Sequence, residues 1–453
     1  MLAYSIPFSP VRDAEAFARI PVCAGVFLLR GSEVHSEPYV SKAANLRRRI
    51  MRLLAAATEP GISKRLNLRD RCATIEFTPT GSDFENIVLL YRTVREVFPE
   101  SYVRHIRFNF SPLIRIHWEN AYPRAYVTRK ASRLFAKNSA AAKSVYYGPF
   151  QSKAIAEKLL NDALDLFKSR RCTFELNPDP AFPGCVYSEM KMCLAPCFKG
   201  CSDEEYMGEV ERVQQFLESR GESLLNELAA LRDKSSAELN FESSASVHAR
   251  IEKVKGVSRG FDEIIRRLDG LDAIILQPAA PLSPSPSEPS AAATDEDQVA
   301  LFRFVCGQIL GPALFSFSPP VDRAPKETQM PPDHSALTEN DEHKKESSER
   351  PPTAGTKVLE SSLAVLLDQL QPAANPTSNA SMEQLAILKR WYYRSNRSGE
   401  IFFCDPIGKR PLRRILRGVF RLRQQNLSSG EGKAAAKRVE TPGSYESRPT
   451  NPS

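Results

Sequence analysis

Four cysteines within 26 residues are the densest set of potential metal ligands in the sequence. They follow the spacing C-x12-C-x7-C-x3-C, with Cys201 four residues further on, and they are Cys172, Cys185, Cys193 and Cys197. Four thiolates at short spacing can hold a tetrahedral Zn²⁺ or an iron–sulfur cluster, and the spacing alone does not separate these two ligands. Thiols that cluster in a reducing compartment are more often metal ligands than disulfides, so unconnected cysteines are the less favoured interpretation.

A second candidate site is a cationic segment with a tyrosine at its start. Residues 39–53 read YVSKAANLRRRIMRL, with five basic residues and no acidic one. Its apolar residues Leu46, Ile50 and Leu53 fall on one face of a helix, and the arginines lie elsewhere on it. A solvated surface helix would look the same. The alternative is a helix that faces phosphate, because the arginine fork donates two hydrogen bonds to phosphate oxygens. Its candidate DNA-binding residues are Arg47, Arg48 and Arg52.

A third candidate lies near the C-terminus. Residues 409–423 read KRPLRRILRGVFRLR, with seven basic residues and no acidic one. An amphipathic basic helix of this kind either contacts phosphate or a protein partner, or lies on a membrane surface. We favour the first interpretation, with the arginines at i+4 spacing as DNA-binding candidates: Arg413, Arg417 and Arg421.

Composition limits the class of protein. The chain has 453 residues, of which 42% are hydrophobic, and its net charge is +8. This length predicts roughly three domains, and the apolar content excludes wholesale disorder. No apolar run reaches the length of a membrane span and no secretory signal is evident, so we expect a cytoplasmic protein that makes no membrane contact.

Hydrophobic periodicity predicts an α+β multidomain protein. The predicted order is a small mixed α/β domain, a connector with the cysteine cluster, a helical hairpin, a β-rich segment, a disordered linker, a small α+β segment with the basic helix, and a disordered tail. Their ranges are 15–102, 103–202, 203–256, 265–318, 319–356, 357–425 and 426–453. Two helices cannot bury all their apolar residues, so the hairpin either packs on its own domain or pairs with a partner helix pair.

The segments GVFLLRG and YVSKAANLRRRI resemble the GIY-YIG nuclease domain at the N-terminus of UvrC, the incision subunit of bacterial nucleotide excision repair. The resemblance runs from about residue 20 to 255 and includes TGSDFENIVLL and YYGPFQSKAIAEKLL. It implies phosphodiester hydrolysis with one divalent metal, Mg²⁺ or Mn²⁺, which neutralises charge on the phosphate and activates water.

Only part of the family's catalytic set is retained in this sequence. Tyr39, Lys42 and Arg49 match the family's second-motif tyrosine, its lysine and its helix arginine. The first-motif tyrosine is replaced by Phe27, and the second-motif glycine by Ser41. The family's metal-binding glutamate aligns with Leu90, and the asparagine twelve residues later with Tyr102. Leucine offers a cation no oxygen.

Glu85 is the nearest acidic substitute for that glutamate. It lies five positions before Leu90 on the same predicted helix, about 140° around the axis, and would not point at the same spot. The resemblance therefore implies a nuclease fold that binds DNA without cutting it.

The resemblance also implies a cofactor and a partner. The segments RRCTFE, PGCVY and KMCLAPC resemble the cysteine-rich segment of the UvrC family, in which the four cysteines are associated with a [4Fe–4S] cluster. The resemblance therefore favours a [4Fe–4S] cluster over zinc at these four cysteines. The stretch LNFESSASVHARI resembles the UVR motif through which UvrC pairs with a UvrB hairpin. The matching residues are Phe241, Glu242, Ala245, Arg250 and Ile251. The family's C-terminal RNase H-like strands are matched only at their start, by DAIILQ and VALFRFVCG, and its helix-hairpin-helix motifs are not evident.

The sequence thus favours a UvrC-like DNA-repair protein that binds DNA and UvrB, through residues 203–256, with an incomplete GIY-YIG site. Two alternatives remain open at this point. One is a stand-alone metal-dependent endonuclease that makes a single incision in damaged DNA. The other is an iron–sulfur redox regulator that binds nucleic acid without a repair role.

Overall fold

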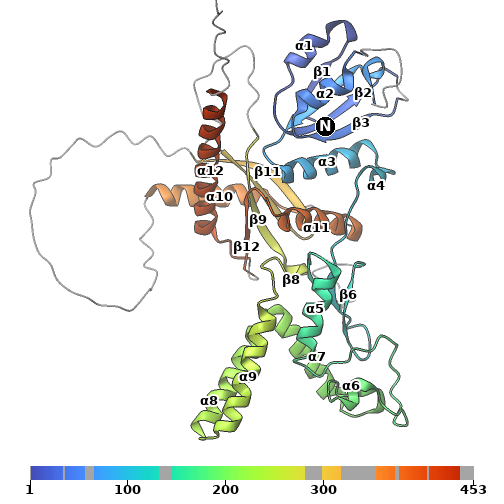
Figure 1. Ribbon diagram of the computed structural model, residues 1–453, viewed down its shortest axis with the longest axis vertical. Helices are drawn as coiled ribbons and strands as arrows, with labels where there is room; N and C mark the ends of the chain where they lie inside the picture. Colours follow the sequence, from blue (N-terminus) through green and yellow to red (C-terminus); the bar gives the residue numbers. More distant parts are fainter. Residues whose placement is uncertain are drawn as a thin grey trace, which may run out of the picture.

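The computed structural model describes residues 2–33, 36–56, 66–131, 144–280, 298–317, 354–372, 377–405 and 408–438. Within these ranges the chain forms three antiparallel four-stranded sheets with helices packed on them, arranged along one long axis (Figure 1). The predicted α+β multidomain class is therefore confirmed. None of the described helices has the length and apolarity needed to cross a membrane.

The N-terminal sheet has the strand order β1-β4-β2-β3. Its strands are β1 (Tyr4–Pro7), β2 (Gly25–Arg30), β3 (Tyr39–Ala43) and β4 (Thr74–Pro79). Successive side chains of a strand point to opposite faces. Phe27 and Leu29 of β2 accordingly pack into a core with α1 (Asp13–Ala18) and α2 (Leu46–Leu54). The next helix, α3 (Asp83–Val97), contacts β2 and β3.

The middle sheet has the order β6-β5-β7-β8. Its strands are β5 (Leu113–Ile116), β6 (Ala125–Thr128), β7 (Val145–Gly148) and β8 (Arg266–Arg267), and the helices around it are α4 (Tyr102–His105), α5 (Lys153–Leu164), α6 (Val186–Glu189) and α7 (Asp203–Glu218). The apolar residues of α5 and α7 share one core with β5 and β7. The predicted hairpin segment 203–256 thus contains α7, which packs on this domain, and a separate helix pair.

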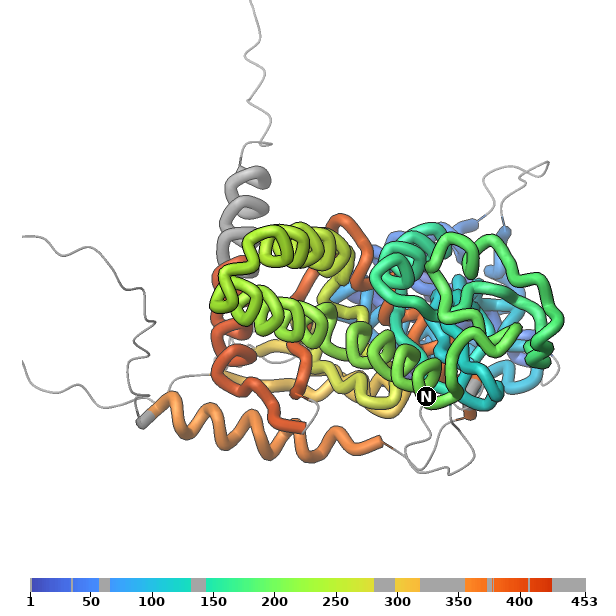
Figure 2. Tube along the Cα trace, turned by 90° about the horizontal axis from the view of Figure 1, so that it is seen from below, coloured from blue at the N-terminus to red at the C-terminus, as the bar shows by residue number. Residues whose placement is uncertain are grey.

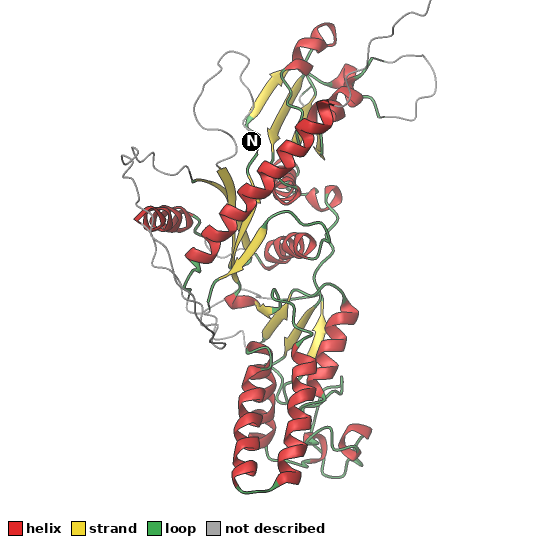
Figure 3. Ribbon diagram, turned by 60° about the vertical axis from the view of Figure 1, so that its left-hand side comes forward, coloured by secondary structure: helices red, strands yellow, loops and turns green. Residues whose placement is uncertain are grey.

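That helix pair is α8 (Glu222–Ala237) and α9 (Phe241–Ser258). The two helices lie side by side and extend from the body at one end of the long axis (Figures 1 and 3). In the view along that axis they lie nearest the reader (Figure 2). The three-residue turn between them is therefore the end of the hairpin furthest from the sheets.

The C-terminal sheet joins two segments that are far apart in sequence. It has the order β11-β10-β9-β12, with β9 (Asp272–Pro278), β10 (Gln298–Val305), β11 (Gln308–Ser316) and β12 (Glu400–Phe403). The segments 265–318 and 357–425, predicted as separate units, therefore contribute strands to one sheet. The predicted linker 319–356 falls almost entirely outside the described residues, as does the part of the predicted tail beyond residue 438.

Helices cover both faces of this C-terminal sheet. Ile274 and Leu276 of β9 pack with α10 (Ala354–Gln369) and α12 (Leu412–Arg438) on one face. Ala273 and Ile275 pack with α11 (Ser378–Tyr392) on the other. The helix α12 continues past residue 425, where the sequence predicts the tail to begin.

The helix α3 connects the N-terminal sheet to the C-terminal one. Phe84 of α3 lies edge-on to Phe302 of β10 at 5.1 Å between ring centroids, and 5.2 Å from Trp391 of α11. Ile87, Val88 and Tyr91 belong to the same buried cluster. The helix therefore contacts a different sheet on each of two faces, and this arrangement fixes the position of β3 and its Tyr39 relative to the C-terminal domain.

Candidate functional site

Tyr39 and Arg49, predicted as site residues, lie next to each other. Tyr39 is the first residue of β3, and Arg49 lies in the first half of α2. The Nη2 atom of Arg49 donates a hydrogen bond to the Tyr39 hydroxyl at 3.4 Å. The buried residues Leu46 and Ile50 anchor α2, and the Asn45 side chain caps it by accepting from the Arg48 N–H at 2.9 Å. The fold thus presents a phenol and a guanidinium together at the surface of the N-terminal sheet.

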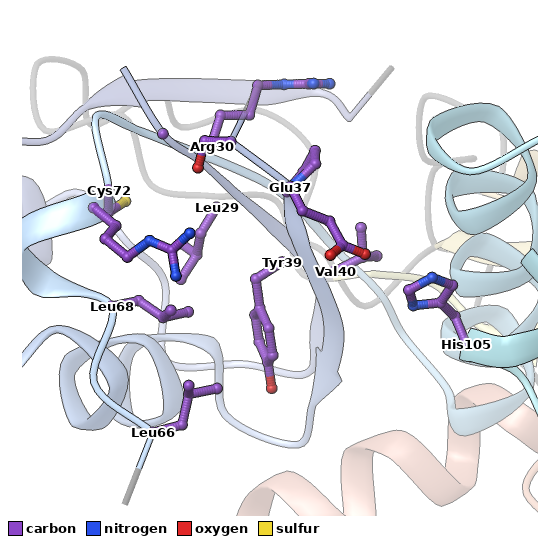
Figure 4. Close-up of a pocket in the computed structure, with 13 residues that line it drawn as sticks. Leu29, Arg30, Glu37, Tyr39, Val40, Leu66, Leu68, Cys72 and His105 are labelled. Carbon is purple, nitrogen blue, oxygen red and sulfur yellow. The ribbon is translucent and has the colours of Figure 1, made fainter. Parts of the chain in front are cut away.

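A pocket of about 300 Å³ opens beside Tyr39 (Figure 4). Three of its lining residues carry or can acquire a positive charge, Arg30, Arg71 and His105. Arg30 forms an ion pair with Glu76 of β4, so Arg71 and His105 contribute most of the positive charge at the pocket. Glu37 is the acidic side chain among the described residues that line it. In Figure 4 the Glu37 carboxylate lies on the side of the pocket that faces His105, whereas the Tyr39 hydroxyl points the other way. This charge balance favours an anion such as phosphate near the pocket.

Phe27 occupies the position where the related nuclease motif has a tyrosine. Its ring is fully buried, 6.1 Å from the Tyr39 ring between centroids. It lies opposite Ser41 in the pairing of β2 with β3. Phenylalanine has no hydroxyl, so this position supplies packing to the site and no proton transfer.

Lys42, the third predicted residue of this set, faces an acidic partner. Its Nζ lies 2.8 Å from Asp83 at the start of α3, and Asp83 also forms an ion pair with Arg394, which follows α11. Burial raises the pKa of Asp83, but the hydrogen bond from Lys42 and the charges of Lys42 and Arg394 outweigh it and lower the pKa below its ordinary value. The lysine is therefore joined through one carboxylate to the C-terminal domain.

The three predicted DNA-binding arginines of α2 differ in their surroundings. Arg47 donates from Nε to the Ile20 carbonyl at 2.6 Å and from Nη2 to the Ala18 carbonyl at 3.0 Å. Its guanidinium therefore holds the turn after α1. Arg48 and Arg52 are exposed. Their side chains are accessible to a phosphate backbone, whereas that of Arg47 is engaged in the fold.

The predicted arginines of α12 face acidic side chains of their own domain. Arg421 forms a two-pronged ion pair with Glu400 of β12, from Nε at 2.8 Å and from Nη2 at 2.5 Å. Arg413 lies 3.3 Å from Glu360 of α10. Arg417 lies between Arg413 and Arg421, one helical turn from each of them along α12. Part of the positive charge read from residues 409–423 is thus balanced by neighbouring helices and strands.

The four predicted metal-ligand cysteines lie in one loop region around α6. Cys172 and Cys197 contribute to the same small core, with Leu176 and Ala195. Burial raises the pKa of Cys193 to about 11, and an N–H from Ala195 at 3.3 Å partly opposes this rise. The other three sulfurs lie close enough to raise that pKa further. A guanidinium N–H of Arg170 points at the Cys172 sulfur at 3.6 Å.

The contacts of the four cysteines in this loop can be compared with those that a bound metal requires. The N–H groups directed at sulfur suit thiolate ligands, because they stabilise negative charge on sulfur. Among the described residues, however, no three His, Cys, Asp or Glu side chains are placed to hold a metal ion. The loop therefore gathers the four cysteines without closing them into a ligand shell.

The helical hairpin exposes apolar side chains at its outer end. Phe241 is 70% exposed and Leu239 is 72% exposed. Glu242 and Ala245, also predicted as partner contacts, are exposed as well. Ile251 is buried between the hairpin helices, and Arg250 donates to the Leu166 carbonyl at 3.3 Å. The predicted partner residues thus divide into an exposed group at the turn and a group that packs on the chain itself.

Comparison with known proteins identifies the relatives of this chain. Residues 111–216 match the family model of the UvrC/Cho excinuclease middle domain. Proteins named UvrABC system protein C match over about half of the chain. The one from Bdellovibrio bacteriovorus is 26% identical over 56% of this chain and 38% of its own length. The one from Geotalea daltonii is 27% identical over 55% and 40%, and that from Brucella abortus 30% identical over 51% and 36%.

This chain is a relative of the UvrC family. It spans less than half the length of these UvrC proteins. No solved structure matches it. The matched family model covers β5 to most of α7, so strands β5, β6 and β7 of the middle sheet and the cysteine loop are the part of the fold that this comparison identifies directly.

The positions aligned with the catalytic residues of the UvrC family have other contacts here. Leu90 is a half-buried residue of α3. The carboxylate of Glu85 accepts a hydrogen bond from the Gly81 N–H at 2.7 Å, so it stabilises the turn before α3. Burial raises its pKa, and the Gly81 contact partly opposes this. Tyr102 donates to Glu383 of α11 at 2.8 Å. Glu85 is therefore used in the fold.

Several charged residues near these sites carry no clear signal in the sequence. Glu37 lines the Tyr39 pocket, and its only sequence signal is its place two residues before Tyr39. Glu383 lies between two tyrosines of the N-terminal half. Lys389 is buried in α11. The last two residues lie almost 300 positions from their neighbours in space, so no local pattern in the sequence indicates the contact.

Proposed function

We propose that this protein acts in a UvrC-like DNA-repair role, binding DNA at the Tyr39 pocket without cutting it. One observation carries the proposal: Arg49 donates to Tyr39 beside a pocket lined by Arg71 and His105. Leu90, which the resemblance aligns with the family's metal ligand, has no oxygen to offer, and Glu85 holds the turn at Gly81. A guanidinium and a phenol can bind a phosphate through hydrogen bonds. Hydrolysis needs in addition a cation beside that phosphate.

The described residues support binding better than metal-dependent cutting. No three acidic, histidine or cysteine side chains among them are placed around a common point. The carboxylate nearest to Lys42 is that of Asp83, which is balanced by Lys42 and Arg394. Both cations compete with a metal for its oxygens. The chain's own residues thus bind and orient a phosphate, and no proton-transfer step follows from their placement.

A single-incision endonuclease is the second candidate function, and Glu37 is the observation that favours it. This acidic side chain lines the same pocket as Tyr39 and is exposed. A carboxylate there supplies an oxygen ligand of the kind that Mg²⁺ prefers. The two functions predict different effects of Glu37, so they can be separated by experiment.

A plasmid-nicking assay tests the proposal. Full-length protein is incubated with damaged supercoiled DNA and Mg²⁺ or Mn²⁺, with and without UvrB. We expect no nicking above that of the Tyr39→Phe variant. Metal-dependent nicking that is lost in both Tyr39→Phe and Glu37→Gln would instead establish the endonuclease. Glu33→Gln, an exposed acidic residue near the same strand, serves as the matched control.

We further propose that the outer end of the α8–α9 hairpin docks on a UvrB-like helical partner. Phe241 and Leu239 are exposed there, and large apolar side chains at the end of a projecting hairpin suit a helix-to-helix contact. Phe241→Ser should abolish co-purification with UvrB and leave the melting temperature unchanged. Val365→Ser, an exposed apolar residue of α10, is the matched control. Equal retention of UvrB by both variants would place the contact elsewhere.

For the cysteine loop we propose the [4Fe–4S] cluster that the family resemblance implies, with zinc as the alternative. Cys172, Cys185, Cys193 and Cys197 are the ligands in this proposal, supported by the N–H groups that point at two of the sulfurs. The cluster would link parts of a loop that has only a small core of its own. Its role is structural or redox-sensing.

A further inference from the structure

A second pocket lies where α3 and α11 meet, apart from the Tyr39 pocket. Its volume is about 290 Å³. We call it the α11 pocket. Its walls come from Ile87 of α3, from residues 106–109 after α4, and from Ala386, Ile387, Lys389 and Arg390 of α11. Pockets between domains are a common place for small ligands, and the helices that line this one, α3 and α11, belong to the N-terminal and C-terminal halves of the chain.

Lys389 is the unusual residue of the α11 pocket. The residue is only 6% exposed. Among the described residues its ammonium group has neither an ion pair nor a hydrogen-bond acceptor. Burial lowers its pKa, and the positive charge of Arg129 lowers it further. The Nζ atom itself is not among the fully buried polar atoms, so the stem of Lys389 is buried while its ammonium group reaches the pocket. An anion that enters the pocket can therefore bind this ammonium group without displacing a partner from the described residues.

Two more cations line the same pocket. Arg107 and Arg390 are exposed at its edge, and none of the lining residues is acidic. Three like charges around about 290 Å³ favour an anion with several acceptor oxygens, such as a phosphate group. A small inorganic anion would leave the rest of this volume empty.

The rest of the pocket is apolar, with one amide. Ile87, Ile106 and Phe108 form its walls, and Asn109 is the neutral polar side chain among the lining residues. Aliphatic and aromatic walls suit a flat heteroaromatic ring, and an asparagine amide can pair with the donor and acceptor on the edge of a base. A phosphate joined to a flat polar-edged ring is a nucleotide.

We propose that the α11 pocket binds one nucleotide, with its phosphate on Lys389 and its base against Ile106 and Phe108. The ligand is either a free mononucleotide or an unpaired nucleotide carried on a DNA strand, since both present the same groups. The inference goes beyond the proposed function because it does not depend on the Tyr39 pocket or on UvrB.

Fluorescence titration of the full-length protein tests this proposal. The probes are 2-aminopurine deoxyribonucleoside 5′-monophosphate and a single-stranded decamer that contains one 2-aminopurine. We expect saturable binding that Lys389→Met weakens by about tenfold or more. Lys253→Met, an exposed lysine of α9, should bind within about twofold of the wild type. Saturation by the monophosphate identifies the free nucleotide as ligand, and saturation by the decamer alone identifies the strand-borne one.

Two further variants keep the test decisive. Lys389→Met keeps an apolar stem of similar length in the buried position and removes only the charge, so its melting temperature should stay close to that of the wild type. Arg390→Gln changes an exposed side chain and should weaken binding by a smaller factor even if Lys389→Met unfolds the protein. The effect of Lys389→Met on monophosphate binding should persist in an Arg49→Gln background, which separates this pocket from the Tyr39 pocket. Equal affinities of Lys389→Met and Lys253→Met, or no saturable binding of either probe, would overturn the proposal.

Discussion

Glu383 is the residue whose replacement tests most directly how the two halves of the chain are joined. It lies in α11 and is 3% exposed. Its carboxylate accepts hydrogen bonds from the hydroxyls of Tyr91 and Tyr102, each at 2.8 Å. Arg95 in turn donates to the Tyr91 hydroxyl at 2.8 Å. The Glu383→Ala variant removes the acceptor for both tyrosines at once.

The expected loss of stability follows from these contacts. A hydrogen bond to a charged acceptor contributes about 1.5–3 kcal/mol, and a buried hydroxyl left without its acceptor is itself unfavourable. Tyr91 is buried and cannot recruit water, whereas Tyr102 is partly exposed and can. We therefore expect Glu383→Ala to lower the unfolding free energy by about 2–4 kcal/mol. Glu383→Gln should lower it by about half as much, because its amide oxygen still accepts one hydrogen bond.

Trp391 provides a local probe for this measurement. The chain has two tryptophans, so a Trp118→Phe background makes Trp391 the sole emitter. Trp391 is buried against Phe84 of α3, at the same junction. Urea unfolding followed by its fluorescence then reports on the joining of α3 to α11. Glu211→Ala, an exposed acidic residue in the middle of α7, is the control and should stay within about 0.5 kcal/mol of the parent.

The reasoning is refuted if Glu383→Ala unfolds at the same urea concentration as the control. Such a result would mean that the two tyrosine contacts add nothing to stability beyond the apolar packing of Phe84. A lower stability of Glu383→Ala with an unchanged slope against urea would support the stated magnitude.

Three further outcomes are expected. Arg48→Gln should reduce the salt dependence of DNA binding by roughly one phosphate contact, whereas Arg47→Gln should lower the melting temperature, as measured by anisotropy and calorimetry. Cys193→Ser should remove bound iron and visible absorption from anaerobically purified protein, whereas Cys404→Ser, buried in the C-terminal domain, should keep both. Because its folded pKa is lowered, Asp83 should stabilise the protein fully above about pH 5 and lose this effect as the pH falls below about 4, and Asp83→Asn should flatten that part of the pH–stability curve.

The relation between sequence and site differs among the four predicted sites. The Tyr39–Arg49 contact could be predicted, because the strand and the helix that carry them are adjacent in sequence and each has a regular hydrophobic pattern. The two helices of the hairpin could be predicted from their hydrophobic pattern, but not which partner candidates are exposed, because Ile251 is buried and Arg250 contacts the Leu166 carbonyl. The role of Arg47 could not, because its acceptors are backbone carbonyls of a turn, and such groups leave no signal in the residue types.

The sequence by itself determined the local elements and the chemical groups that they carry. Continuous apolar runs specify β9 and β10, and the spacing of Cys172 to Cys197 places four thiols in one loop. Only the tertiary structure decided that residues 400–403 complete the sheet begun at residue 272, and that α3 is buried between two sheets. The physical reason is that a local pattern shows which side of an element avoids water, but not which distant surface will cover it. The buried Glu383 and Lys389 depend on that second choice, because their surroundings come from chain segments almost 300 residues away.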